Sequence, residues 1–159
     1  MGRTTSSGIA EGTGATGSAL LIFRLARATG YRLAEALAAL DMRMHEFAVL
    51  QHLQQAGPFS QQELSSALRI NPSNLVGLLD TLERDGLIVR PRDPRDRRRH
   101  LVELTAEGRR RLTEAKRAVA TAEQDLLAPL TERERVQLKG VLERLASHTC
   151  SAVGRGRAC

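Results

Sequence analysis

Two helix-start signals lie close together in the middle of this sequence, and they constrain the fold more than any other feature. Residues 60–63 read Ser-Gln-Gln-Glu, a capping box in which the Ser and Glu side chains bond each other's backbone N–H groups. Asn71 then offers a second N-cap, and Pro72 takes the first helical position, where its missing N–H costs nothing. A short helix ending near Leu68, a tight turn and a second helix ending at Gly86 predict a helix-turn-helix.

The hydrophobic period changes directly after this motif. Residues 87–90 and 100–104 are typical of strands, whereas residues 90–99 hold six Arg and two Asp and cannot be regular. Two short strands joined by a charged turn predict a β-hairpin, which in this position is a wing. Residues 90–99 carry four of the six net positive charges of the chain. This concentration favours a polyanionic partner, with a solvated charged loop as the alternative.

Further helices are predicted on both sides of this lobe. Leu and Ala recur at helical spacing in residues 19–39 and 44–56, and the second of these stretches stops at Gly57. A long helix should begin at Thr105 and end before Pro129, and Thr131 opens a last helix with another capping box. The predicted fold class is therefore mainly α with a small β-hairpin, a winged helix-turn-helix.

The chain is expected to divide into five segments. Residues 1–18 form a flexible leader rich in Gly, Ser and Thr, and residues 149–159 form a flexible tail. The winged helix-turn-helix lobe spans residues 44–104, between a dimerisation helix at 19–43 and dimerisation helices at 105–148. These outer helices have apolar faces that the lobe cannot cover. We therefore expect a homodimer with twofold symmetry.

Several classes of protein are not expected. No stretch of eighteen apolar residues and no signal peptide is present, so no membrane partner and a cytoplasmic location are predicted. Cys150 and Cys159 do not make a disulfide framework, and inert thiols are favoured over a disulfide between tails. The histidines lack the spacing of a metal site, and no catalytic motif occurs. Neither a cofactor, a metal nor an enzymatic activity is expected.

At this point three segments carry a resemblance to a known family. Residues 79–88 contain L-x-x-L-E-R-D-G-L-I, residues 93–105 read D-P-R-D-R-R-R-H-L-V-E-L-T, and residues 106–108 read A-E-G. In this order they resemble the MarR family of winged-helix regulators, over about residues 19–148. The resemblance implies a triangular dimer that straddles a palindromic DNA site, usually as a repressor. It also implies release by a small phenolic or aromatic effector.

The resemblance places base contacts at the start of the second helix of the motif, which enters the major groove. The candidates are Pro72, Ser73, Asn74 and Gly77. Asn74 can pair with adenine through two hydrogen bonds, although Ser73 and Asn74 can instead satisfy free amides in the first helical turn. The family often has a small hydroxyl residue and an Arg where this chain has Val76 and Gly77. Gly77 is a candidate for close approach of the backbone to DNA.

The motif match assigns Arg98 to the minor groove, with Asp96 holding its guanidinium. Contacts to phosphates or the DNA backbone are expected from the remaining candidates, namely Arg95, Arg97 and Arg99 of the hairpin, the amides near Ser60 and Gln61 at a helix start, and Arg84. Polar residues on otherwise apolar helices are candidates for the effector site, namely Arg24, Arg27, Tyr31 and His45.

These features together predict a DNA-binding transcription regulator whose partners are double-stranded DNA, a second copy of the chain and a small-molecule effector. The alternative is a non-catalytic module in which the winged helix binds protein and the charge of the wing is incidental.

Overall fold

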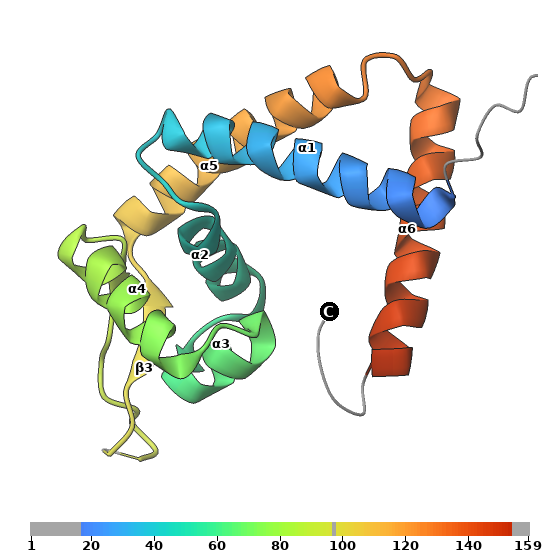
Figure 1. Ribbon diagram of the computed structural model, residues 1–159. Helices are drawn as coiled ribbons and strands as arrows, with labels where there is room; N and C mark the ends of the chain where they lie inside the picture. The colour runs from blue at the N-terminus through green and yellow to red at the C-terminus, as the bar shows by residue number, and fades with distance from the viewer. Residues whose placement is uncertain (1–16, 97, 154–159) are drawn as a thin grey trace, which may run out of the picture.

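The computed structural model describes residues 17–96 and 98–153 and contains six helices and three short strands within them. They follow one another as α1 (Ser18–Ala38), α2 (Met44–Ala56), β1 (Phe59–Ser60), α3 (Gln61–Leu68), α4 (Pro72–Arg84), β2 (Ile88–Val89), β3 (Leu101–Leu104), α5 (Ala106–Leu126) and α6 (Glu132–Val153). Figure 1 shows a lobe built from α2, α3, α4 and the strands, from which α1 and α5 lead away toward α6.

The two helices of the predicted motif begin at the residues that the sequence marks. Ser60 Oγ accepts from the Glu63 amide at 3.3 Å, and the Ser60 amide donates to Glu63 Oε2 at 2.8 Å. Asn71 Oδ1 caps α4 by accepting from the Ser73 amide at 2.9 Å. These contacts span two or three residues, so the sequence alone was sufficient to locate them.

The end of α4 requires a glycine. Gly86 adopts φ 71°, a left-handed conformation that other residues avoid. Its amide donates to the Glu83 carbonyl, and the Leu87 amide donates to the Leu82 carbonyl, both at 2.9 Å. This pair of bonds is a Schellman motif, and it turns the chain from α4 into β2.

The strands form one antiparallel sheet in the order β1-β3-β2. Ile88 pairs with Leu104, which confirms the predicted wing hairpin. The third strand was not predicted, since β1 has only two residues and no alternating pattern of its own. Phe59 in β1 pairs with Val102, so it joins the sheet through a partner far along the chain.

The core of the lobe lies where α2, α3 and α4 meet the sheet and the start of α5. Leu50, Leu64, Leu75 and Leu79 are fully buried there. The C-terminal end of α1 also joins this core through Leu37, which is fully buried. The remaining buried apolar side chains are Met42, Phe47, Val49, Leu53, Leu82, Leu87, Ile88, Val102, Leu112 and Ala115.

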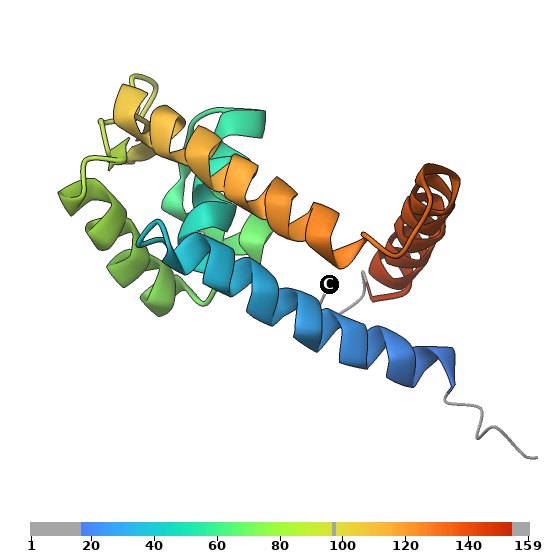
Figure 2. The same cartoon turned by 90° about the horizontal axis from the view of Figure 1, so that it is seen from above.

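Helices α1 and α5 run side by side away from the lobe, whereas α6 stands apart from it (Figures 1 and 2). The N-terminal half of α1 exposes Leu21, Phe23 and Leu25, of which Phe23 is 59% exposed. Helix α6 exposes Val136 and Leu142. Both outer helices therefore carry exposed apolar side chains that no residue in 17–96 or 98–153 covers.

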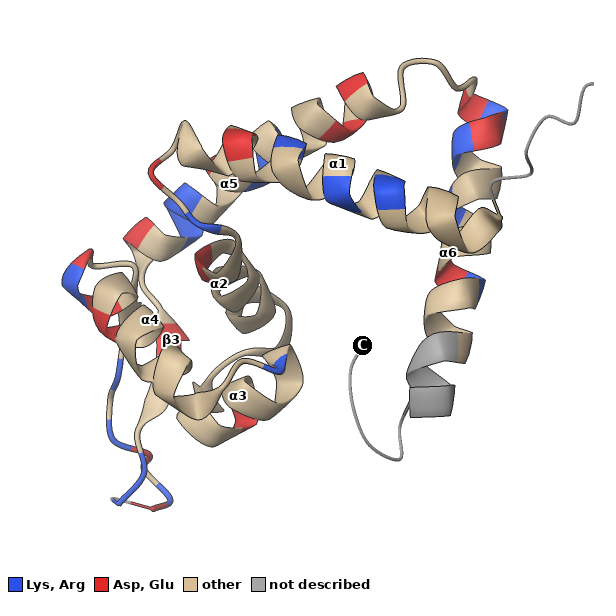
Figure 3. Cartoon of the chain, viewed as in Figure 1, with Lys and Arg blue, Asp and Glu red and all other residues tan. Residues whose placement is uncertain are grey.

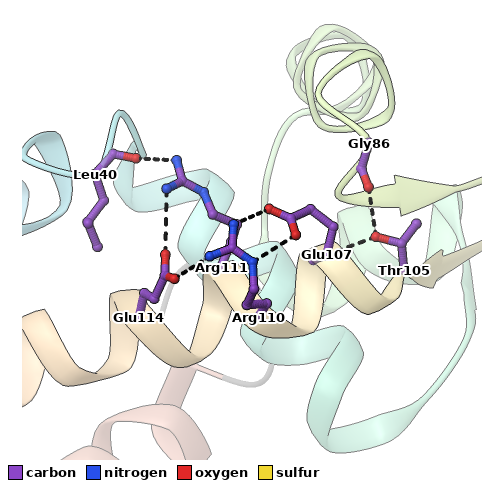
Figure 4. A network of polar contacts seen from close by, with 8 residues as sticks. Leu40, Gly86, Thr105, Glu107, Arg110, Arg111 and Glu114 are labelled. Carbon is purple, nitrogen blue, oxygen red and sulfur yellow. Dashed lines mark hydrogen bonds and ion pairs between the residues drawn. The ribbon is translucent and has the colours of Figure 1, made fainter.

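The beginning of α5 is fixed to the end of α4 through Thr105 (Figure 4). Thr105 Oγ1 donates to the Gly86 carbonyl at 2.7 Å and accepts from the Gly108 amide at 2.9 Å. One hydroxyl therefore caps a helix and links two elements. Further along α5, Arg111 Nη2 donates to the Leu40 carbonyl at 2.6 Å and ties α5 to the turn before α2.

We expect Thr105→Ala to lower the free energy of unfolding by about 1–2 kcal/mol, because the cap is lost and the Gly86 carbonyl loses its donor. Urea denaturation monitored by circular dichroism measures this change. Thr105→Ser keeps the hydroxyl and should retain most of the stability. Equal stability of the Ala variant and the natural chain would contradict the linking role.

Two boundaries differ from the sequence prediction. Helix α1 begins at Ser18, within the predicted leader, and α6 continues to Val153, past the His148 at which the last helix was expected to end. No Pro or Gly interrupts residues 149–153, so the helix continues into the predicted tail. The rest of the leader and tail, with Cys159 and the side chain of Cys150, lies outside the described residues.

Candidate nucleic-acid interface

The N-terminal edge of α4 presents polar side chains to solvent. Pro72, Ser73, Asn74 and Gly77 are all exposed, while Leu75 on the opposite side of the helix is fully buried. Because Asn71 caps the helix, the side chains of Ser73 and Asn74 have no hydrogen bond to another part of the described chain. These two side chains are therefore available to a partner.

The tip of the wing is shaped by two short aspartate-centred turns. Asp93 Oδ1 accepts from the Arg95 amide at 2.8 Å, and Asp96 Oδ1 accepts from the Arg98 amide at 3.0 Å. Asp96 therefore holds the backbone of Arg98 in the chain without DNA, whereas the resemblance assigned it to the guanidinium. The short side chain of an aspartate bonds the backbone amide two residues further along the chain more readily than it bonds the end of a long side chain. The side chains of Arg95 and Arg98 are exposed, and Arg97 lies outside the described residues.

Arg99, which the sequence analysis assigned to a phosphate contact, has a side chain that is 48% exposed and that also bonds the start of α3. Its Nη2 donates to Ser60 Oγ at 3.1 Å and lies 3.8 Å from Glu63 Oε1. The pair lies 39 residues apart in sequence, so no local pattern predicts it. Arg99 therefore joins the loop of the wing to the start of α3.

At the start of α3, where a phosphate contact was predicted, the Glu63 carboxylate already takes part of the hydrogen-bonding capacity. Ser60 is only 5% exposed, and its amide and hydroxyl both bond the Glu63 carboxylate. These hydrogen bonds lower the pKa of the Glu63 carboxyl, so it remains negative near the helix end. Gln61 is half-buried. A negative carboxylate at this position weakens the case for a phosphate there.

Basic residues gather along the loop between β2 and β3, at the end of the lobe farthest from α6 (Figure 3). Arg84, at the end of α4, is exposed and hydrogen-bonds Thr81 Oγ1 at 3.2 Å. Arg90 differs from the other arginines, because its side chain is only 26% exposed and bonds Asp80 and Glu83 of α4. Sequence reasoning did not single out Arg90.

The four predicted effector residues are not brought together. His45 lines a cavity of about 630 Å³ beside α4, together with Arg43, Arg69, Asn74 and other residues of the motif. Arg24, Arg27 and Tyr31 are exposed on α1 and do not line this cavity. The structure therefore separates His45 from the three residues of α1.

Two absences hold for the residues that the structure describes. No group of three or more His, Cys, Asp and Glu side chains in residues 17–96 and 98–153 is arranged to hold a metal ion. Within the same part of the chain, every helix is too short or too polar to cross a membrane.

The fold and the exposed edge of α4 beside an arginine-rich hairpin define a winged helix-turn-helix protein. The sequence model of the MarR family matches residues 42–100. An HTH-type transcriptional repressor of Mycobacterium bovis, Mb2911, is 30% identical over 127 residues, which cover 80% of this chain and 91% of the relative. The chain belongs to the MarR family.

Other relatives agree with this assignment. A putative transcriptional regulatory protein for the hcr operon of Thauera aromatica is 36% identical over 62% of this chain and 60% of its own length. Wild-type MarR from E. coli in its apo form superposes with a TM-score of 0.72 at 28% identity, over 79% of this chain and 93% of that chain. A mutant MarR from E. coli complexed with operator DNA gives a TM-score of 0.68 at 28% identity, over 79% and 90% of the two chains.

Proposed function

We propose that this chain is a DNA-binding transcription regulator that acts in the cytoplasm as a homodimer on a palindromic operator, most simply as a repressor. The observation that carries the proposal is the pairing of two exposed features on one lobe. The edge of α4 offers Ser73 and Asn74 to a major groove, and the wing tip offers Arg98 to an adjacent minor groove and Arg95 to a phosphate. A relative of the same fold has been crystallised with operator DNA.

Selection of duplexes from a random library with the purified full chain tests this proposal. We expect an inverted repeat, because two lobes related by a twofold axis read two half-sites about one helical turn apart. Footprinting of the selected duplex should protect roughly 16–20 base pairs. If the chain binds all duplexes equally at low salt, the proposal fails and the alternative of a protein-interaction module is favoured.

The homodimer rests on the uncovered apolar side chains of the outer helices. Contiguous exposed apolar surface usually marks a protein interface, and a second copy of the chain carries the same surface and can cover it by twofold symmetry. The side chains concerned are Leu20, Leu21, Ile22, Phe23 and Leu25 of α1 and Val136, Val141 and Leu142 of α6.

We expect the natural chain to sediment as a dimer at micromolar concentration and Phe23→Glu to sediment as a monomer. A carboxylate placed in this apolar surface would have to be buried without a partner when two copies associate. Sedimentation equilibrium measures both states. A monomeric natural chain, or a dimer that Phe23→Glu leaves intact, would contradict the proposed interface.

We also propose that a small aromatic or phenolic effector releases the protein from DNA. Arg24, Arg27 and Tyr31 offer guanidinium and hydroxyl groups on α1, and His45 offers an imidazole at the cavity beside α4. A guanidinium can pair with a carboxylate or phenolate through two hydrogen bonds. Adding hydroxybenzoates to the complex with the selected duplex tests whether the DNA is released.

Replacing Gly77 by Ala should change the stability of the fold and the affinity for DNA in opposite directions. A Cβ at this position meets nothing within 4 Å, so Gly77→Ala should raise the free energy of unfolding by about 0.5–1 kcal/mol through helix propensity. If DNA approaches the backbone there, the same variant should bind the selected duplex more weakly. Urea denaturation and fluorescence anisotropy measure the two effects. Unchanged or tighter binding would exclude the close approach.

A further inference from the structure

Arg90 is bonded to two carboxylates of α4, although it lies in the basic stretch of residues 90–99. Its Nη2 contacts Asp80 Oδ1 at 2.7 Å and also contacts Glu83 Oε2, while its Nε donates to Glu83 Oε2 at 2.9 Å. We call Arg90, Asp80 and Glu83 the helix–wing cluster. The bond to Arg90 lowers the pKa of the Glu83 carboxyl, which therefore keeps its charge at neutral pH.

The helix–wing cluster connects the two elements that the proposed function requires to act together. Asp80 and Glu83 lie three residues apart on one side of α4, and Arg90 directly follows β2. Because β2 has only two residues, its backbone hydrogen bonds alone constrain the angle between the wing and α4 only weakly. A guanidinium presents its N–H groups in a rigid planar fork, so bonds to two carboxylates constrain direction as well as distance.

Four arginines of residues 90–99 therefore have different surroundings. Arg90 is bonded to α4, and Arg99 is bonded to the start of α3. Arg95 and Arg98 have exposed side chains at the tip. Arg90 thus bonds the base of the wing to α4, Arg99 bonds the loop of the wing to the start of α3, and Arg95 and Arg98 face solvent.

From this division we propose that Arg90 is a positioning residue for DNA recognition. By bonding Asp80 and Glu83 it sets the distance and angle between the N-terminal edge of α4 and Arg98 at the wing tip, so that both can enter adjacent grooves. This inference rests on the proposed function. It differs from a direct phosphate contact by Arg90, which the basic character of the stretch would otherwise indicate.

The direction in which Glu83→Ala changes the affinity for DNA distinguishes a positioning role of Arg90 from a direct phosphate contact. Removing a carboxylate from a DNA-binding lobe should tighten binding if simple electrostatics governs it, because DNA is a polyanion. If Glu83 instead holds Arg90 in place, Glu83→Ala should weaken binding to the duplex selected with the natural chain, by roughly threefold to thirtyfold. Binding to a scrambled duplex of the same length should be unchanged or tighter, since it does not depend on the alignment of two grooves.

Asp85→Ala is the matched control. It removes a carboxylate at the same end of α4, but Asp85 contacts Arg84 and not Arg90. We expect this control to bind the selected duplex as tightly as the natural chain or more tightly. Fluorescence anisotropy at one fixed salt concentration measures all these affinities. Glu83→Ala binding as tightly as Asp85→Ala would overturn the proposal.

A double-mutant cycle gives an independent test. Arg90→Gln should weaken binding in the natural chain and weaken it much less in the Arg98→Ala background, because the groove contact that Arg90 aligns has been removed there. A direct phosphate contact would instead give additive losses, with a salt dependence reduced by about one unit for Arg90→Gln alone. Arg90→Lys should recover only part of the affinity, since an ammonium lacks the planar fork.

Hydrogen exchange in the DNA-free chain completes the test. Amides of residues 88–104 should exchange faster in Glu83→Ala and Arg90→Gln than in the natural chain, while those of α5 should not change. Unchanged exchange in the wing would overturn the positioning role even if the variants bind DNA poorly. If no duplex is preferred by the natural chain, the proposed function itself fails, and the exchange result still reports whether the helix–wing cluster holds the wing.

Discussion

Arg98→Ala should weaken binding to the selected operator by roughly 1–3 kcal/mol for each wing. An arginine side chain fits the narrow minor groove of A·T-rich DNA, where the negative potential is strongest. Arg98 is exposed at the tip, and its backbone amide is already held by Asp96 at 3.0 Å. Since Ala keeps that amide, the tip should keep its shape and the loss should be confined to the DNA contact.

Anisotropy titrations on the selected duplex measure this loss, and thermal unfolding should show no change in the midpoint. Arg117→Ala is a suitable control, because it removes one exposed arginine from the middle of α5, away from the wing. The preference for A·T pairs at the edges of the site should also disappear in Arg98→Ala. Equal affinity of the Arg98 and Arg117 variants would remove the minor-groove role from the proposal.

Gly108→Ala should destabilise the fold by about 3 kcal/mol, near the upper end of the usual cost of overpacking. A Cβ at Gly108 would lie 2.0 Å from the Leu87 carbonyl oxygen and 3.0 Å from Leu104 Cδ2. The carbonyl cannot move away easily, because it accepts from the Thr105 amide at 3.1 Å and belongs to the turn that ends α4. The first turn of α5 would therefore have to shift away from the lobe.

Denaturation in urea compares this variant with Gly30→Ala, which is the matched control in α1. A Cβ at Gly30 meets nothing within 4 Å, so that variant should gain about 0.5–1 kcal/mol from helix propensity. The two identical substitutions should thus have opposite signs. A Gly108→Ala variant as stable as the natural chain would show that the close approach to Leu87 is not needed.

The wing shows which features could be predicted from the sequence and which could not. The hairpin was predicted from a change of period, and its strands lie where the pattern placed them, at β2 and β3. The roles of Arg90 and Arg99 were not predictable in the same way. The acceptor of Arg99 lies 39 residues away, and Glu83 lies on the preceding helix. The arginines of residues 90–99 look alike in the sequence, because the residue type does not indicate which distant acceptor each side chain bonds in the folded chain.

The candidate effector residues also show what the sequence cannot predict. Four polar residues on apolar helices were grouped by residue type, but His45 lines the cavity beside α4 while Tyr31 is 68% exposed on α1. Position on a helix face predicts which residues are exposed. It does not predict which of them share a cavity, since that depends on how helices cross.

The sequence by itself determined where α3, α4 and α5 begin, the order of the helices and the resemblance to the MarR family, but not the end of α6 or the strand β1. Ser60, Asn71 and Thr105 act on amides two or three residues away, so their effect is local and can be read from spacing alone. Only the tertiary structure decided why residue 108 must be Gly and which arginines are bonded to the helices. Those outcomes depend on atoms that meet only after the chain has folded, and the distance along the sequence does not encode them.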